Sequence, residues 1–218
     1  GEFYEARQFT PADTELPRTA QLCGREIPFG TDLLFCCREA PEFVLGVEIC
    51  EDLWSIRPPS IRMAEAGASI IANLSASDET AGKVQYRRNL VCGQSARLVC
   101  GYVYAGAGDG ESTTDMVFAG HRLIAENGVL LAESGLFSSG LTVSEIDVQR
   151  LYGERQRMST YPAAGDTMRR IPFSLPLSET KLTRFVSSAP FLPAEGPQRA
   201  GRCEEILSIQ AHGLATRL

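Results

Sequence analysis

The sequence predicts an α/β protein in which short buried strands alternate with helices. The first observation is an apolar run rich in Val and Ile at residues 43–49, which is short and interrupted by Gly46, and so suits a core strand better than a helix. The second is a stretch at 83–99 with its apolar residues on one stripe, as in an amphipathic helix. The third is Asn127-Gly128 between two apolar runs, the strongest short-range signal of a β-hairpin.

The other expected elements follow from the same kinds of pattern. Pro58 and Pro59 begin a helix at 60–66, because proline suits the first helical turn. Asp147 is the expected N-cap of a helix that runs to about residue 158. The remaining strands are expected at 69–74, 102–105, 116–119, 122–125, 129–132 and 141–146.

The sequence predicts one domain over residues 1–174, followed by a linker and a helix. From 175 to 201 the composition shifts to Pro, Ser and Gly, which is typical of a linker. Residues 202–218 are amphipathic with the period of a helix.

Composition predicts a soluble cytoplasmic enzyme piece. A chain of 218 residues can bury one sizeable core. The net charge of -6 argues against a nucleic-acid partner, and no apolar run approaches the length of a membrane-spanning helix. Seven cysteines, an odd number without the density of a disulfide scaffold, fit a reducing compartment. The sequence has no Cys-x-x-Cys pair and no His-rich cluster, which argues against a zinc site, and we expect no metal site.

Cys50 is the candidate nucleophile. It directly follows the predicted strand at 43–49 and precedes two acids, so it falls on the bend between a strand and a helix. A side chain on such an elbow is exposed, and the main-chain N–H groups that follow it can point at an oxyanion. The alternative role, a small apolar residue of the core, fits the six other cysteines, none of which ends a strand beside acids.

The acids around Cys50 create a chemical requirement. Glu48, Glu51 and Asp52 lie within two residues of the thiol, and negative neighbours disfavour a thiolate. The thiol therefore needs a cation, a general base or both from elsewhere in the fold. Neither of the two histidines lies in a segment that makes a convincing partner for it.

A series of motifs runs through the first 134 residues. They are GEFYEARQF at the start, GVEICEDLW around Cys50, PPS at 58–60, AGASIIANLSAS, GKVQYRR, QSAR, GYVYAGAGDGESTTD and IAENGVLLAES. Together and in this order they resemble the glutaminase domain of the glutamine-dependent NAD synthetases, within the nitrilase (carbon-nitrogen hydrolase) superfamily.

The resemblance implies that Cys50 is a nucleophile that works with a Lys, which stabilises the tetrahedral intermediate, and a Glu base. It places both partners before Gly1, so we expect the chain to begin inside the catalytic domain and to have little or no glutaminase activity alone. Glu2 matches a supporting carboxylate that orients the Lys. Residues 202–218 resemble the first helix of the synthetase domain, so we expect the chain to end inside that domain.

Three further residues match the family's glutamine pocket. By resemblance, the main-chain N–H of Glu51 belongs to the oxyanion hole, and the hydroxyl of Ser77 bonds the amino-acid end of glutamine. Lys83 stands where some relatives have Arg, and a cation there suits the substrate carboxylate. The alternative for Ser77 and Lys83 is the ordinary polarity of a loop and of a helix start.

The glycine-rich stretch at 106–114 does not match a phosphate-binding loop. Glu111 stands where that motif has its Lys, and an acid at this place repels phosphate. We expect instead a turn close to the rim of the active site.

The resemblance also implies a fold and a function. The fold is the four-layer α-β-β-α sandwich of the nitrilases, here without its N-terminal strands and helices and therefore with exposed apolar sheet edges. The complete protein is expected to hydrolyse glutamine through a Cys50 thioester. A synthetase domain of the same polypeptide then uses the ammonia, with ATP and magnesium, to amidate nicotinic acid adenine dinucleotide to NAD.

The glutaminase part is expected to need no cofactor, and the complete protein is expected to form a homo-oligomer. Two alternatives stay open. One is a stand-alone nitrilase-type amidase that acts on another small amide. The other is a non-catalytic module that keeps the fold and has lost the reaction.

Overall fold

The computed structural model describes residues 16–111, 116–161, 168–188, 196 and 199–217. The chain divides into two compact units, Gly1–Thr180 and Lys181–Leu218. The second unit contains helix α4 (Arg199–Ala215), which covers most of the predicted C-terminal helix and starts three residues earlier. The predicted domain limits at 174 and 201 stay a prediction, and Glu2 lies outside the described residues.

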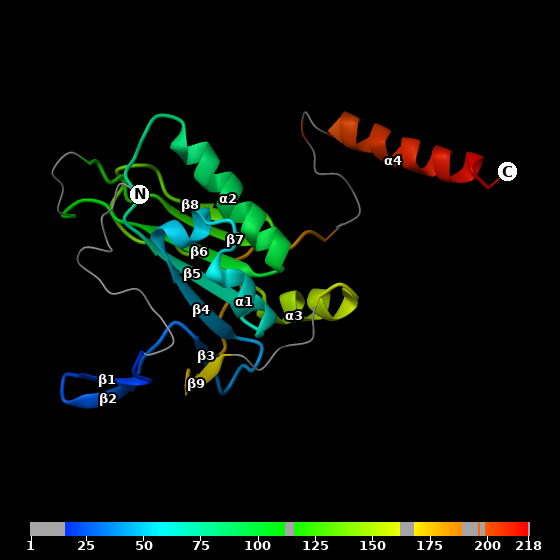
Figure 1. Ribbon diagram of the computed structural model, residues 1–218. Helices are drawn as coiled ribbons and strands as arrows, with labels where there is room; N and C mark the ends of the chain where they lie inside the picture. The colour runs from blue at the N-terminus through cyan, green and yellow to red at the C-terminus, as the bar shows by residue number, and fades with distance from the viewer. Residues whose placement is uncertain (1–15, 112–115, 162–167, 189–195, 197–198, 218) are drawn as a thin grey trace. The chain divides into compact units, whose positions relative to one another are not determined.

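A seven-stranded mixed sheet forms the centre of the first unit (Figure 1). Its order is β8-β7-β6-β5-β4-β3-β9, in which β4, β5 and β6 run parallel. Their C-terminal ends therefore meet at one edge of the sheet, where ligand sites of open α/β sheets lie. The strands are β3 (Leu33–Cys37), β4 (Val44–Ile49), β5 (Ile70–Ser75), β6 (Gly101–Gly106), β7 (Arg122–Glu126), β8 (Val129–Glu133) and β9 (Arg169–Phe173).

The expected hairpin is confirmed and joins β7 to β8. Asn127 and Gly128 both have positive φ, of 45° and 84°, as this kind of turn requires. A β-carbon at position 128 would lie 2.9 Å from the Cβ of Ala96, so the turn also needs glycine for space. Because Gly128 has no β-carbon, the hairpin can lie close against helix α2.

Helices cover one face of the sheet. The α1 helix (Pro59–Glu65) packs on β4, and α2 (Lys83–Leu98) packs on β6 and β7. The glycine that interrupts β4, Gly46, allows α1 to come close, because a β-carbon there would lie 2.8 Å from the Sδ of Met63. The buried core between helices and sheet includes Leu34, Ile71, Val91, Tyr102 and Leu123.

A third helix, α3 (Val148–Arg157), begins as the sequence predicts. The Asp147 carboxylate accepts a hydrogen bond of 2.9 Å from the main-chain N–H of Arg150, which is an N-cap. Near its other end, the buried Arg155 donates to the carbonyl oxygens of Val99, Leu98 and Ala68, at 2.9, 3.0 and 2.7 Å. This arginine joins α3 to the turns that precede β5 and β6.

Two strand predictions are wrong. Residues 116–119 form no strand, because their main chain bonds to loops: the N–H of Glu79 donates to Val117 O at 2.7 Å, and that of Phe137 to Ala119 O at 2.7 Å. Residues 141–146 form no strand either, and Leu141 is 94% exposed. In both segments the apolar alternation has no neighbouring strand to pair with.

The sequence analysis missed four strands. Strands β1 (Thr19–Leu22) and β2 (Arg25–Pro28) form a separate antiparallel hairpin. The other two, β3 and β9, pair in parallel at one side of the main sheet. Pro172 weakens the strand pattern of β9, but an edge strand tolerates proline because half of its N–H groups need no partner.

Apolar side chains are exposed at an edge of the sheet, as predicted, where Val129 of β8 is 61% exposed, and also on its central strands. Ile49 and Leu74, which are paired in the register of β4 and β5, are 66% and 55% exposed although both strands are central. The predicted α/β class is confirmed. None of the described helices is long and apolar enough to cross a membrane.

Candidate active site

Cys50 lies on the predicted elbow. Strand β4 ends at Ile49, and Cys50 is the first residue of the short 3-10 helix η2 (Cys50–Trp54). Its φ is 48°, in the left-handed region that residues with a β-carbon rarely adopt. Such strain costs on the order of 1 kcal/mol and occurs most often at functional sites.

Two side chains hold the elbow in this conformation. The Asp52 carboxylate accepts a hydrogen bond of 2.8 Å from the main-chain N–H of Ile49. Asn73, fully buried in β5, donates from Nδ2 to the carbonyl oxygen of Cys50 at 3.3 Å. The turn is therefore fixed from both sides of the thiol-bearing residue.

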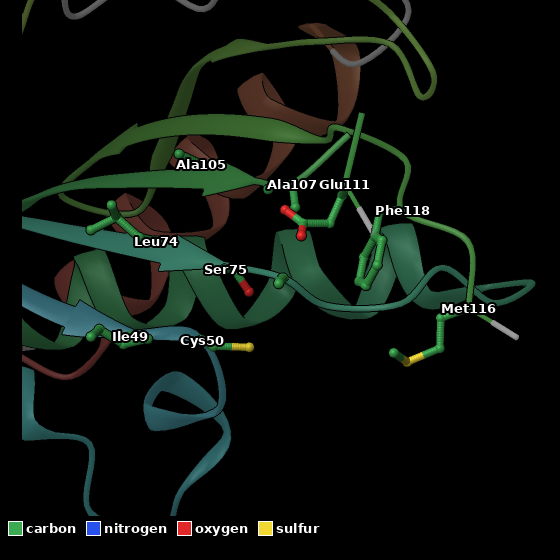
Figure 2. A pocket seen from close by; sticks show the side chains of 11 residues that line it. Ile49, Cys50, Leu74, Ser75, Ala105, Ala107, Glu111, Met116 and Phe118 are labelled. Atoms are coloured by element: carbon green, nitrogen blue, oxygen red, sulfur yellow. The ribbon is translucent and has the colours of Figure 1, made fainter. Parts of the chain in front are cut away.

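The thiol of Cys50 lines a cavity of about 630 Å³ at the C-terminal ends of β4, β5 and β6. Figure 2 shows the sulfur at one wall, the Glu111 carboxylate at the other and the Ser75 hydroxyl between them in this view. Met116 and Phe118 form a further, apolar wall. A buried strand thus presents a half-buried thiol to a space large enough for a small amide.

Glu48 does not face this cavity, although the sequence analysis counted it among the acids beside the thiol. It is 1% exposed and lies on the helix side of β4. Its carboxylate accepts hydrogen bonds from the Tyr102 hydroxyl and from the main-chain N–H of Ser60, the latter at 2.9 Å. Burial and the Glu48 charge raise the pKa of Tyr102, so its phenol stays a donor.

A buried ionic network supports two walls of the cavity. Arg87 donates from Nη2 to Glu79 at 3.0 Å, and its Nη1 lies 2.8 Å from Nδ1 of His121. The Nε2 of His121 lies 2.7 Å from the Glu133 carboxylate. Because Arg87 can only donate, Nδ1 is the acceptor and Nε2 carries the proton. Burial and the charge of Arg87 lower the pKa of His121, which agrees with a neutral ring.

Both ring nitrogens of His121 are thus used by other partners. This agrees with the prediction from the sequence that His121 is not the partner of Cys50. The network instead connects the segment after β5, through Glu79, with the segment before β7, through His121.

Three residues were predicted from the sequence to bind the substrate glutamine, and the structure describes all three. Glu51 is exposed, directly after Cys50 in η2. Lys83 is the first residue of α2, as predicted, and its Nζ bonds the carbonyl and carboxylate oxygens of Asp78, each at 2.6 Å. Ser77 is half-buried two residues beyond β5. From this segment Ser75 and Ala76 line the cavity, and neither Ser77 nor Lys83 lines it.

Ser75, Glu111, Met116 and Phe118 line the cavity but were not predicted from the sequence as site residues. One signal was available, since the glycine-rich stretch was expected near the rim, and Gly106 and Glu111 do line the cavity. Gly106 is required by space: a β-carbon there would lie 2.7 Å from the carbonyl oxygen of His121. Nothing in the local pattern indicated which loop residues turn inward.

None of the other described cysteines lines this cavity. Cys100 is fully buried, and burial raises the pKa of its thiol to about 12, as expected of a core residue. Among the described residues, no group of three or more His, Cys, Asp or Glu side chains is placed to hold a metal ion.

No family model matches the chain. A glutamine-dependent NAD(+) synthetase from Mycobacterium tuberculosis is 45% identical over 229 residues, which cover 100% of this chain and 33% of that protein. A glutamine-dependent NAD(+) synthetase from Drosophila melanogaster is 32% identical over 169 residues, which cover 71% of this chain and 21% of that protein. This chain thus spans about a third of the length of the first of these curated relatives.

A solved structure agrees with these relatives. The crystal structure of a glutamine-dependent NAD(+) synthetase from Cytophaga hutchinsonii is similar with a TM-score of 0.51 and 33% identity, over 64% of this chain and 22% of that one. The resemblance seen in the sequence motifs is confirmed. The chain belongs to the glutamine-dependent NAD(+) synthetase family, and its fold is of the α/β class.

Proposed function

We propose that this chain provides the glutaminase site of a glutamine-dependent NAD(+) synthetase, with Cys50 as the nucleophile. The observation that carries the proposal is the position of the thiol: it lies on a strained elbow at the end of β4 and opens into a cavity of about 630 Å³. Enzymes of acyl transfer use this arrangement to expose a nucleophile beside main-chain N–H donors.

The proposed reaction has two steps. The sulfur of Cys50 adds to the side-chain amide carbon of glutamine, the C–N bond breaks, and ammonia leaves with the thiol proton. Water then cleaves the thioester, which yields glutamate and restores the thiol. The N–H of Glu51, which follows the nucleophile, is proposed to bond the oxyanion. Ser77 and Lys83 are proposed to contact the amino-acid end, and Glu2 to orient the family's Lys.

The cation and the base that the thiol needs are assigned by resemblance to positions before Gly1. We also propose that a synthetase domain of the same polypeptide uses the ammonia to amidate nicotinic acid adenine dinucleotide. That domain would bind ATP and magnesium, whereas the glutaminase site would need no cofactor. A cytoplasmic homo-oligomer is part of the same proposal.

A labelling experiment on the complete protein tests the nucleophile. The protein is treated with a diazoketone analogue of glutamine and digested, and its peptides are mapped by mass spectrometry. We expect one adduct, on Cys50, whose formation glutamine slows by competition. We also expect Cys50→Ser to abolish both the adduct and the release of ammonia from glutamine.

Cys36→Ser is the matched control, because Cys36 is also half-buried but lies in β3, away from the cavity lining. It should leave labelling and ammonia release unchanged. An adduct on another cysteine, or full glutaminase activity in Cys50→Ser, would disprove the assignment.

A further inference from the structure

Glu111 brings a carboxylate into the cavity that holds the Cys50 thiol. It follows β6 in a turn that is closed by a hydrogen bond of 3.1 Å from its main-chain N–H to the carbonyl oxygen of Gly108. Figure 2 shows its side chain directed back toward the strand ends, on the opposite wall from the sulfur. Glu111 has no role in the reaction proposed for Cys50.

Ser75 presents another polar group in the same cavity to which the proposed reaction assigns no role. It is the last residue of β5 and is 6% exposed. Its buried Oγ has no hydrogen-bond partner among the described residues. Since buried hydroxyls almost always have a partner, this group is suited to bond a bound molecule. The pairing of Ile49 with Leu74 places Ser75 level with Cys50.

Glu111 is itself exposed, and apolar side chains line much of the rest of the cavity. Most of the other lining side chains are apolar or small, among them Leu74, Ala105, Met116 and Phe118. A charge acts more strongly on a ligand where nearby water is displaced by such groups. A carboxylate at this wall therefore favours a ligand that carries a cation and disfavours a neutral or anionic one at the same place.

We infer that Glu111 binds the ammonium group of an α-amino acid amide while its amide end lies beside Cys50 and the Ser75 hydroxyl. This inference rests on the proposed glutaminase function and adds the origin of its selectivity. The site selects amides that bear a free ammonium group over amides of the same length without it. Glu111 acts on binding, and Ser75 acts at the reacting amide.

The test compares two substrates in the complete protein: L-glutamine, and glutaramate, which lacks only the amino group. In Glu111→Gln we expect the KM for glutamine to rise about tenfold, because one charge-assisted hydrogen bond to the substrate is lost. The kcat should change little. The kcat/KM for glutaramate should stay within about twofold of the unmodified protein, since this amide makes no bond that depends on the charge. Ser75→Ala should lower kcat/KM several-fold for both substrates.

The matched control is Asp109→Asn, which removes an acid from the same exposed loop but not from the cavity lining. It should leave the kinetics of both amides unchanged. An equal loss on both amides in Glu111→Gln would overturn the inference, because Glu111 would then act on the amide chemistry. Unchanged kinetics in Glu111→Gln would overturn it too. If the unmodified protein released no ammonia from glutamine, the proposed function itself would fail.

Discussion

At the scale of the residue, Cys50 combines a reactive group with an unfavourable backbone. Its φ of 48° would be relaxed in an isolated peptide, so the native fold must hold it. The bonds from Asn73 to its carbonyl and from the Ile49 N–H to Asp52 do this. In this conformation the thiol is turned out of the strand and into the cavity.

A pair of substitutions measures this strain. Glycine adopts positive φ without steric cost, so we expect Cys50→Gly to be more stable than Cys50→Ala by about 0.5–1 kcal/mol, after allowing for the greater freedom of unfolded glycine. Urea unfolding of the two variants gives the difference. At Cys36, in the regular strand β3, the order should reverse. Equal stability of the two Cys50 variants would mean that its conformation carries no strain.

Asn73 should control the reactivity of the thiol without touching the substrate. In Asn73→Ala the Cys50 carbonyl loses its donor, and we expect labelling of Cys50 by the glutamine-analogue diazoketone to slow about tenfold, because small shifts of a reacting group are costly. Asn89→Ala, on the exposed side of α2, is the control. If Asn73→Ala reacted at the normal rate, the bond would have no role in positioning.

The sequence predicted the position of Cys50, the proposed nucleophile, at a strand end, but not all of its surroundings. This position could be predicted because a buried strand that ends at a thiol leaves a local pattern. The inward orientation of Ser75 and Glu111 depends on how β5 and the loop after β6 meet in space, which no local pattern records. For Glu48 the local pattern was misleading, since strand alternation places neighbouring residues on opposite faces.

At the scale of the element, α2 holds the loops that surround the cavity. Arg87 reaches Glu79 and His121, and Arg88 donates to Glu133 at 2.6 Å. These bonds connect the helix to segments on both sides of β6. The cavity walls therefore depend on one helix, although none of the network's side chains lines the cavity.

The network makes stability depend on pH. Burial and Arg87 lower the pKa of His121 from its ordinary value of 6.5, so the unfolded chain binds a proton there more readily than the folded chain. The free energy of unfolding should therefore fall as the pH drops from about 6.5 through the folded pKa. His121→Gln should remove this part of the slope. Urea unfolding at a series of pH values measures it.

The second histidine provides the control for this experiment. His212 lies exposed in α4, so His212→Gln should leave the slope unchanged. The Glu133, Glu79, Arg87 and Arg88 side chains remain in both variants. A slope that persists in His121→Gln would assign the pH dependence to the acids.

Elements with regular local patterns were predicted to within a residue or two. Strand β4, expected at 43–49, spans Val44–Ile49, and α2, expected at 83–99, spans Lys83–Leu98. The failures in the main sheet have one cause: residues 116–119 and 141–146 have apolar patterns but no partner strand, whereas β3 and β9 have weak patterns but pair with each other. Strand formation depends on a partner that is distant in sequence.

At the scale of the whole molecule, the first unit is joined across long sequence separations by a few buried side chains. Arg155 is the clearest example, because it bonds three carbonyl oxygens from two separate turns and lies 4.9 Å from the centre of the Tyr161 ring. Through it, α3 is attached to the body that carries the sheet. The α/β class was predictable from local patterns, but such links were not.

Removing this link should destabilise the whole unit. In Arg155→Ala three carbonyl oxygens each lose a donor, although that of Leu98 keeps the Tyr161 hydroxyl, and we expect a loss of about 3 kcal/mol in the free energy of unfolding. Arg157→Ala is the control, since that side chain is 78% exposed, and should change stability by less than about 0.5 kcal/mol. Equal urea midpoints for the two variants would show that Arg155 is dispensable.

The close approach of Gly106 to the carbonyl of His121 restricts any redesign of the enzyme. Random mutagenesis that aims to accept bulkier amides would lose most of its members if position 106 were varied, because any side chain collides with main-chain atoms there. The neighbouring Ala105 and Ala107 border the same cavity, and Ala105 is exposed while Ala107 is half-buried. Diversity is best introduced at these two alanines, with the glycine between them kept constant.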